Sequence, residues 1–488
     1  MKVHRVTRSA LIFGALSLLV ACASAVPDAP QRKGSQFAAA AAAPLRQSSE
    51  IRFDARQVSH EFYGFGTQIW TTELTDSVLN ALRALDIDYI RFSATPSNSD
   101  FGAPIPVDAS PQEMDRFVRA HFDDKSRLGQ AKRLFAAARE MNISTVLLIW
   151  AAPSPWLAGK KDLQAGYVDD FARLWGAIVQ YMANEGMRPD YIELVNEPHG
   201  DWNTHIKPDL YSRLVSLTRE DLDRRGLRQV GILGPGAASQ VSQKWVDALD
   251  REARGSLAGW SAHNYERQDK LAREVFEPFA SSARRAEARK PLFLTEYSSQ
   301  RLRYGNREFP ARKIQGLPRD QIVSYSPLFA VQVYQNTLSL INSGANSLFY
   351  WQLGDYSWSG EGNTGLIDRQ GMPKPSFTAL RTLFPKIPDH ADVLRPLQTD
   401  AQITAAAFRH NDEIVFALAN NTPQAQTSHV VISPPLQPAQ VETEAFDNGQ
   451  VTAKPVSLSP DGSGFTVSLP AWSTETVLLR YPRGALPK

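Results

Sequence analysis

Residues 191–198 read YIELVNEP, an apolar run that ends in Glu197 and a proline. Residues 291–297 read PLFLTEY and carry Glu296 at the equivalent place. Short continuous apolar runs are typical of strands that are buried on both faces. Because proline cannot donate a hydrogen bond to a sheet, the first strand should stop at Pro198. Both glutamates are therefore expected at the carboxyl ends of strands.

Six further runs of this kind lie between residues 63 and 386, separated by helical patterns. The eight expected strands are Tyr63–Trp70, Tyr89–Thr95, Ser144–Ala152, Tyr191–Glu197, Gln229–Gly234, Gly259–Tyr265, Pro291–Tyr297 and Ser347–Leu353. The clearest expected helices are Leu74–Leu85, Met114–Met141 (continuous or broken), Tyr167–Glu185, Asp209–Asp223 and Pro327–Ser343. Eight strand–helix units close into a parallel barrel, so the sequence predicts a (β/α)8 TIM barrel over residues 63–386.

The segment after the barrel has a different pattern. Residues 387–488 show short alternating runs, separated by turn clusters such as Asp461-Gly462-Ser463-Gly464, and no helical period. This pattern indicates a C-terminal antiparallel β-sandwich. Residues 51–62, before the barrel, are expected to supply a short N-terminal strand that joins this sandwich.

The N-terminus has the layout of an export signal. Lys2, Arg5 and Arg8 precede an apolar run over residues 10–20. We therefore expect residues 1–21 to be a signal peptide. Residues 22–50 are rich in alanine, proline, glutamine and serine and are expected to form a flexible tether.

The chain has one cysteine, Cys22, directly after Leu19-Val20-Ala21. This stretch resembles the bacterial lipobox, whose cysteine is lipidated after cleavage. The resemblance implies an outer-membrane lipoprotein of a Gram-negative bacterium. Ordinary cleavage after Ala25 is the alternative, and the protein would then be periplasmic or extracellular.

The overall charge excludes one broad class of partner. The 488 residues carry a formal net charge of +2. Nothing in this balance points to nucleic acid, which strongly basic proteins bind. We expect a monomer.

The two glutamates suggest a chemistry. Strands four and seven of a barrel are expected on opposite sides, so their terminal carboxylates should converge across its axis at the catalytic face. Glycosidic cleavage needs such a pair, one as acid and one as nucleophile or base. The alternative is that each glutamate forms a structural ion pair. The strand ends show no His-x-His and no compact group of ligands with metal spacing, so no metal and no organic cofactor are expected.

Several motifs resemble the clan A retaining glycoside hydrolases, most closely family 30 and its relatives, with families 39 and 5 as alternatives. The resembling stretches are Gly64-Phe65-Gly66, residues 150–157 (WAAPSPWL), Asn196-Glu197-Pro198, His263-Asn264-Tyr265, Thr295-Glu296-Tyr297 and residues 469–474 (LPAWST). The resemblance covers about residues 51–482 and implies Glu197 as acid/base and Glu296 as nucleophile.

The resemblance also implies roles for neighbouring residues. Arg91 would brace the nucleophile, and Asn196 would hydrogen-bond the sugar 2-hydroxyl. His263 and Tyr265 would lie beside the nucleophile, and Trp351 would form the floor of the sugar site. Other tryptophans at strand ends are expected to stack on sugar rings, as aromatic side chains in ligand clefts do: they are Trp70, Trp150, Trp156, Trp202 and Trp358.

These inferences predict hydrolysis of a β-linked polysaccharide or oligosaccharide through a glycosyl-enzyme intermediate. The loop over residues 298–320 carries six basic residues against Glu308 and Asp320, which suits an acidic polysaccharide but is also common in solvated loops. Transglycosylation is an alternative reaction. A carbohydrate-binding matrix lipoprotein without activity is an alternative of another class.

Overall fold

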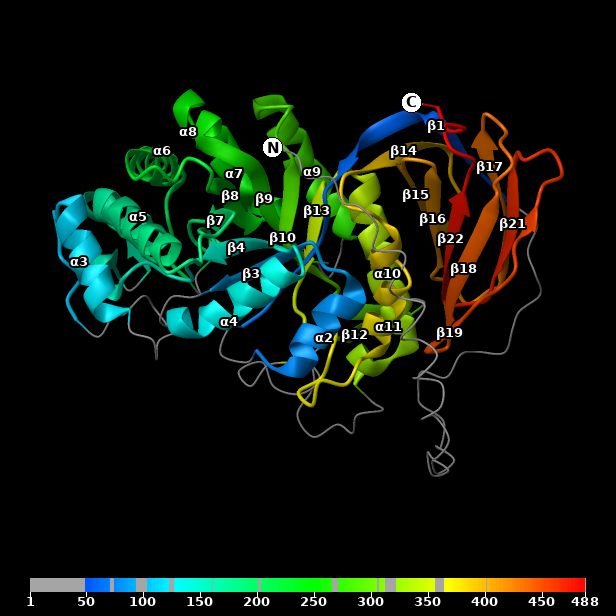
Figure 1. Ribbon diagram of the computed structural model, residues 1–488, viewed down its shortest axis with the longest axis horizontal. Helices are drawn as coiled ribbons and strands as arrows, with labels where there is room; N and C mark the ends of the chain where they lie inside the picture. Colours follow the sequence, from blue (N-terminus) through cyan, green and yellow to red (C-terminus); the bar gives the residue numbers. More distant parts are fainter. Residues whose placement is uncertain are drawn as a thin grey trace. The chain divides into compact units, whose positions relative to one another are not determined.

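The computed structural model describes residues 49–70, 74–93, 103–122, 127–159, 161–200, 203–265, 271–304, 307–311, 322–355, 364–400 and 402–487. Eight parallel strands close into a barrel (Figure 1). They are β2 (Gly64–Gln68), β3 (Tyr89–Ser93), β4 (Ser144–Leu148), β7 (Tyr191–Glu193), β8 (Gly231–Ala238), β9 (Leu257–Tyr265), β10 (Leu292–Ser298) and β13 (Ser347–Tyr350). Each falls within or overlaps an expected strand, and the predicted barrel is confirmed.

Helices follow most of the barrel strands. Their bounds are α2 (Asp76–Leu85), α3 (Pro111–His121), α4 (Arg127–Glu140), α5 (Val168–Asn184), α6 (Pro208–Arg224), α7 (Ser239–Ala248), α8 (Arg251–Ser256), α9 (Ala272–Ala286), α10 (Pro327–Asn342) and α11 (Pro375–Arg381). The segment 114–141 is broken into α3 and α4. A capping box of Ser110 and Glu113 starts α3, since each side chain accepts a hydrogen bond from the other's backbone N–H.

No helix in the part of the chain that the structure describes is long and apolar enough to cross a membrane.

The interior of the barrel is layered. Its lower layer is apolar and includes Tyr89, Phe293 and Phe349. Gly66 makes room for this layer, because a Cβ there would lie 2.7 Å from the Phe349 ring. Arg91 lies two residues after Tyr89 on β3, and Thr295 lies two residues after Phe293 on β10. Both side chains are fully buried. A polar layer therefore lies directly above the apolar one, and it supports the carboxyl ends of the strands.

The C-terminal segment forms a curled sheet of ten strands together with the N-terminal strand. Its strands are β1 (Ser49–Phe62), β14 (Ala391–Gln398), β15 (Ile403–His410), β16 (Glu413–Asn420), β17 (Gln426–Ser433), β18 (Gln440–Asp447), β19 (Gln450–Thr452), β20 (Ser457–Leu458), β21 (Gly464–Leu469) and β22 (Ser473–Arg480). The sheet encloses an apolar core that includes Phe53, Phe416 and Phe465. The predicted sandwich with a joining N-terminal strand is confirmed.

Strand β1 has a larger part than the short strand expected. It is 14 residues long and lies between β14 and β17. It runs antiparallel to β14 but parallel to β17, so this sheet is not purely antiparallel. The parallel pairing is possible because the whole barrel separates β1 from β17 in the sequence.

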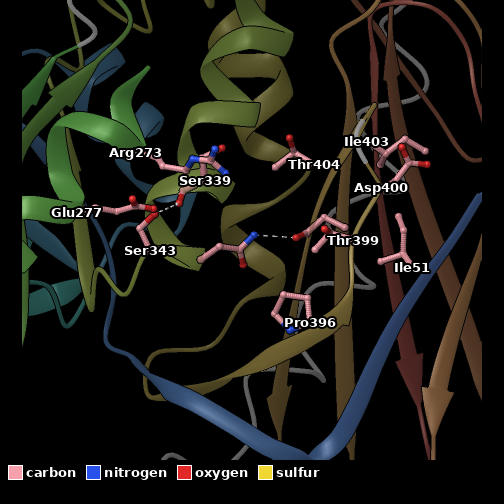
Figure 2. A pocket seen from close by; sticks show the side chains of 12 residues that line it. Ile51, Arg273, Glu277, Ser339, Ser343, Pro396, Thr399, Asp400, Ile403 and Thr404 are labelled. Carbon is pink, nitrogen blue, oxygen red and sulfur yellow. Dashed lines mark hydrogen bonds between the residues drawn. The ribbon is translucent and has the colours of Figure 1, made fainter. Parts of the chain in front are cut away.

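Helix α10 of the barrel bonds to the sheet. The Tyr334 hydroxyl lies 2.8 Å from the Thr476 hydroxyl, and Gln335 donates to Thr404 over 3.0 Å. A cavity of about 240 Å³ lies nearby, lined by residues of α9, α10, β14 and β15 (Figure 2). None of the residues predicted for the active site lines this cavity.

Candidate active site

Glu296 reaches the barrel interior because strand β10 is irregular. Pairing of β10 with β9 shifts register between Leu294 and Glu296. Thr295 and Glu296 are neighbours, yet both side chains bond to groups inside the barrel. Successive side chains of a regular strand point to opposite faces, and a bulge can re-aim one of them. The irregularity thus brings Glu296 to the mouth of the barrel, where it is 3% exposed.

Glu197 enters the same space through a turn. It lies beyond the end of β7 and has a φ of 47°, in the left-handed region that residues with a Cβ rarely adopt. Its backbone N–H donates to the Gly236 carbonyl over 3.2 Å. Such backbone strain, when the surroundings hold it in place, is common at functional sites. The turn lets Asn196 and Glu197, neighbours in sequence, both face the site.

The order of strands corrects one expectation about the two glutamates. Only β8 and β9 lie between β7 and β10 in the eight-stranded barrel, so the strands are not diametrically opposite. The carboxylates still converge. One oxygen of Glu197 and one of Glu296 lie within 4.8 Å of each other, together with a ring nitrogen of His263.

Arg91, on β3, connects the members of the site. Its Nη1 donates to Glu296 over 2.5 Å, and its Nη2 donates to Asn196 over 2.8 Å. Its Nε donates to Glu193 over 2.8 Å, and the guanidinium is fully buried. Charge-assisted bonds of this kind are roughly twice as strong as neutral ones and fix geometry as well.

His263 lies between the two glutamates. Its Nδ1 donates to Glu197 over 3.0 Å and lies 3.3 Å from Glu296. Burial lowers the pKa of His263, but the charge of Glu296 and bonds to Glu193 and Glu197 outweigh burial and raise this pKa to about 9. This raised pKa favours the imidazolium at neutral pH, and Nε2 of the ring lies 3.3 Å from Nη2 of Arg91. The Tyr265 hydroxyl donates to Glu296 over 2.6 Å.

The charges of this buried cluster balance when it holds one carboxyl proton. Arg91 and His263 supply two positive charges, against the three carboxylates of Glu193, Glu197 and Glu296. Burial raises the pKa of Glu296 and Glu197 adds to the rise, while His263, Arg91 and Tyr265 oppose it. One proton on this pair of glutamates would make the cluster neutral, which suits its low exposure.

The group formed by Glu197, His263 and Glu296 also has donor atoms close enough for a metal ion. The sequence showed no such compact group, because its members come from three separate strands. An imidazolium has no lone pair to offer a metal, and Arg91 already neutralises Glu296. The donor set therefore fits proton transfer better than metal binding.

Three tryptophans gather beside the carboxylates. Trp70 stacks on Trp150 with ring centroids 5.3 Å apart, and Trp150 meets Trp351 edge-on at 5.9 Å. The Arg91 guanidinium lies 5.9 Å from the Trp150 ring. Their exposure is intermediate, which suits a wall that a sugar ring can contact.

Other predicted residues do not join this wall. Trp156 is 1% exposed and stacks on Tyr167, so it belongs to the packing beneath the loop and not to the cleft. The sequence pattern could not separate a loop tryptophan that folds inward from one that faces a ligand. Trp202, Trp358 and Cys22 lie outside the described residues.

The basic loop after Glu296 is partly neutralised. Its first part forms a hairpin of β11 (Arg301–Tyr304) and β12 (Arg307–Pro310). Arg301 and Arg303 both pair with Glu308, at 2.8 and 3.2 Å. Three of the six basic residues, at positions 312, 313 and 319, lie outside the described residues.

Sequence reasoning missed the polar residues that support the site. Glu193, Ser261 and Thr295 are fully buried beneath the glutamates. One signal was available, because Glu193 is a charge inside an apolar strand and must have a buried partner. Ser261 and Thr295 gave no such signal.

Several solved structures with this fold are glycoside hydrolases. The family 30 subfamily 8 xylanase from Clostridium acetobutylicum is 15% identical with a TM-score of 0.68, covering 89% of this chain and 100% of its own. A family 30 xylanase C catalytic domain from Talaromyces cellulolyticus is 15% identical with a TM-score of 0.65, covering 88% and 100%. A family 39 enzyme from Xanthomonas axonopodis pv. citri is 14% identical with a TM-score of 0.59, covering 90% and 98%.

This chain therefore shares its barrel-and-sandwich fold with these enzymes, as the sequence resemblance implied. No protein-family model matches the sequence, and no curated protein matches it.

Proposed function

We propose that this protein is a retaining glycoside hydrolase that cleaves β-linked polysaccharides or oligosaccharides. The observation that carries the proposal is the convergence of Glu197 and Glu296 from strands β7 and β10, with carboxylate oxygens within 4.8 Å. Retaining glycosidases place the two carboxyl groups roughly 5–5.5 Å apart, and inverting ones roughly 6.5–9.5 Å to leave room for water. The short separation favours the retaining pathway.

Each residue then has a defined task. A protonated Glu197 gives its proton to the glycosidic oxygen while Glu296 attacks the anomeric carbon, which forms the glycosyl-enzyme and releases the leaving group. Ionised Glu197 then takes a proton from water, whose oxygen displaces Glu296. Arg91 and Tyr265 hold Glu296 by hydrogen bonds. We assign contacts with the sugar to Asn196 and the three tryptophans, because Asn196 bonds to Arg91 and the Arg91 guanidinium lies 5.9 Å from the Trp150 ring.

The test is hydrolysis of a glycan panel that includes xylan, other neutral β-linked glycans and acidic polysaccharides. Glu296→Gln and Glu197→Gln should each lower kcat by at least about 1000-fold, because each removes a group that acts in the reaction. Glu140→Gln is the matched control, since that side chain is 69% exposed on the barrel surface. Full activity in Glu296→Gln would overturn the proposal.

Product analysis separates the competing reactions. Proton NMR of the first product should show the β-anomer, because two displacements restore the configuration. Inversion would contradict the retaining pathway. Transfer to added sugars in place of water would favour the transglycosylase. Binding of one glycan without turnover of any would favour the carbohydrate-binding matrix protein.

The substrate charge and the location are further parts of the proposal. The pairing of Arg301 and Arg303 with Glu308 weakens the case for an acidic substrate, so we propose a neutral glycan first. The basic start and apolar run of residues 1–21 support export, and Cys22 supports a lipid anchor. Labelling with a palmitate analogue, compared with Cys22→Ser, tests the anchor.

A further inference from the structure

Glu193 is a third carboxylate of the barrel, which the reaction above does not use. It lies on β7, four residues before Glu197, and its side chain is fully buried. One of its oxygens accepts hydrogen bonds from Ser261 over 2.7 Å and from Thr295 over 2.8 Å. Its other oxygen lies 2.8 Å from Nε and 2.7 Å from Nη2 of Arg91. One carboxylate thus ties four strands, β3, β7, β9 and β10, beneath the site.

The surroundings hold this carboxylate in one place. A Cβ on Gly236 would lie 2.7 Å from a Glu193 oxygen, so the backbone of β8 packs directly on it. The backbone carbonyl of Gly236 also accepts the hydrogen bond from the Glu197 backbone N–H. Burial raises the pKa of Glu193, but the charges of Arg91 and His263 and the bonds from His263 and Ser261 together outweigh burial and hold this pKa at about 2, so the group is ionised.

Glu193 also determines which edge of Arg91 faces the nucleophile. With Nε and one side of Nη2 on Glu193, Nη1 bonds to Glu296 and Gln68, and the rest of Nη2 faces Asn196 and His263. His263 Nε2 lies 3.9 Å from Glu193 on the side away from Glu197. Tyr211, on α6, is a further buried titratable group near Glu193: burial raises the pKa of Tyr211, and the Glu193 charge adds to the rise.

We propose that Glu193 is a positioning residue that acts through Arg91 and His263, an inference that rests on the proposed function. Its negative charge balances these two cations, so that Glu296 is held in place without being over-stabilised as an anion. Removing the charge should lower the pKa of both Glu296 and His263, because each would lose a nearby anion.

The test compares Glu193→Gln with Glu193→Asp and Ser261→Ala. Glutamine keeps the size of the side chain and loses the charge. The acidic limb of the pH profile of kcat/KM, set by ionisation of Glu296, and the basic limb, set by loss of the His263 proton, should therefore both move to lower pH by about one pH unit. Aspartate keeps the charge, but its shorter side chain places the carboxylate farther from Arg91. We therefore expect kcat to fall by about 100-fold while both limbs of the pH profile stay at the wild-type pH. Ser261→Ala removes a neutral bond at the same carboxylate and should also leave the limbs in place.

NMR titration of His263 gives a readout that needs no turnover. The pKa of this ring, about 9 in the wild type, should fall in Glu193→Gln and stay in Ser261→Ala. Unchanged limbs and an unchanged His263 pKa in folded Glu193→Gln would overturn the role of Glu193. A wild type that hydrolyses no glycan would instead overturn the proposed function, while the His263 titration still decides whether Glu193 sets the charge of the cluster.

Discussion

At the scale of single residues, the raised pKa of Glu296 predicts the lower end of the pH range of activity. Burial raises the pKa of Glu296, and the neighbouring Glu197 adds to the rise. A nucleophile must be ionised, so kcat/KM should increase as pH rises through this raised pKa. The acidic limb should therefore lie above about 4.3, the ordinary pKa of a glutamate. A limb at or below that value would contradict the burial argument.

Glu197→Gln separates the contribution of the neighbour from that of burial. On a substrate whose leaving group needs no acid, the variant should stay active and its acidic limb should move to lower pH, because the like charge beside Glu296 is gone. The exposed Glu140→Gln should leave the limb where it is. The comparison needs only initial rates across the pH range.

Arg91 offers a second prediction at this scale, because lysine cannot reproduce its bonds. The planar guanidinium donates to Glu193, Glu296 and Asn196, whereas an ammonium is a single point charge. Arg91→Lys should lower kcat by about 100-fold through misplacement of Glu296. It should also lower the free energy of unfolding by about 1–3 kcal/mol, because lysine keeps the charge but leaves buried acceptors without a donor. Urea denaturation checks this, with Arg83→Lys on the surface as control.

At the scale of elements, the sequence predicted strands better than the direction of their side chains. Apolar runs and their ends located all eight barrel strands and placed Glu197 and Glu296 at strand ends. The irregularity at Leu294–Glu296 and the positive φ of Glu197 depend on contacts with neighbouring strands, which periodicity does not contain. For the same reason, the sequence did not predict that Trp156 points into the protein or that Glu308 pairs with Arg301 and Arg303.

The hairpin of β11 and β12 gives a prediction about substrate charge. Glu308 neutralises Arg301 and Arg303, which are 20% and 24% exposed. Glu308→Gln should remove the negative charge that both arginines face and lower the KM for an acidic glycan by about 2- to 5-fold, the scale of a partly exposed ion pair. The KM for a neutral glycan should not change, and salt should abolish the gain. An equal effect on both glycans would show that the hairpin acts by shape instead.

At the scale of the whole molecule, β1 connects the two ends of the sequence. The expected short strand is in fact a 14-residue strand inside the curled sheet, where it pairs with β14 and β17. Sequence patterns predicted that these residues join the sandwich. They could not predict the partners of β1, because its pairing with β17 spans more than 300 residues and depends on the barrel folding between them.

This arrangement predicts that barrel and sandwich unfold together. Phe53 of β1 is fully buried against Phe416, with ring centroids 5.6 Å apart. Phe53→Ala should lower the free energy of unfolding by about 3–5 kcal/mol, the usual cost of emptying such a site. Since Tyr334 and Gln335 bond the barrel to the same sheet, the loss should appear in one transition. Calorimetry should show a single peak at lower Tm, with activity lost in the same range. Val58→Ala, on an exposed part of β1, is the control, and two separate peaks would mean that the barrel is stable without the sandwich.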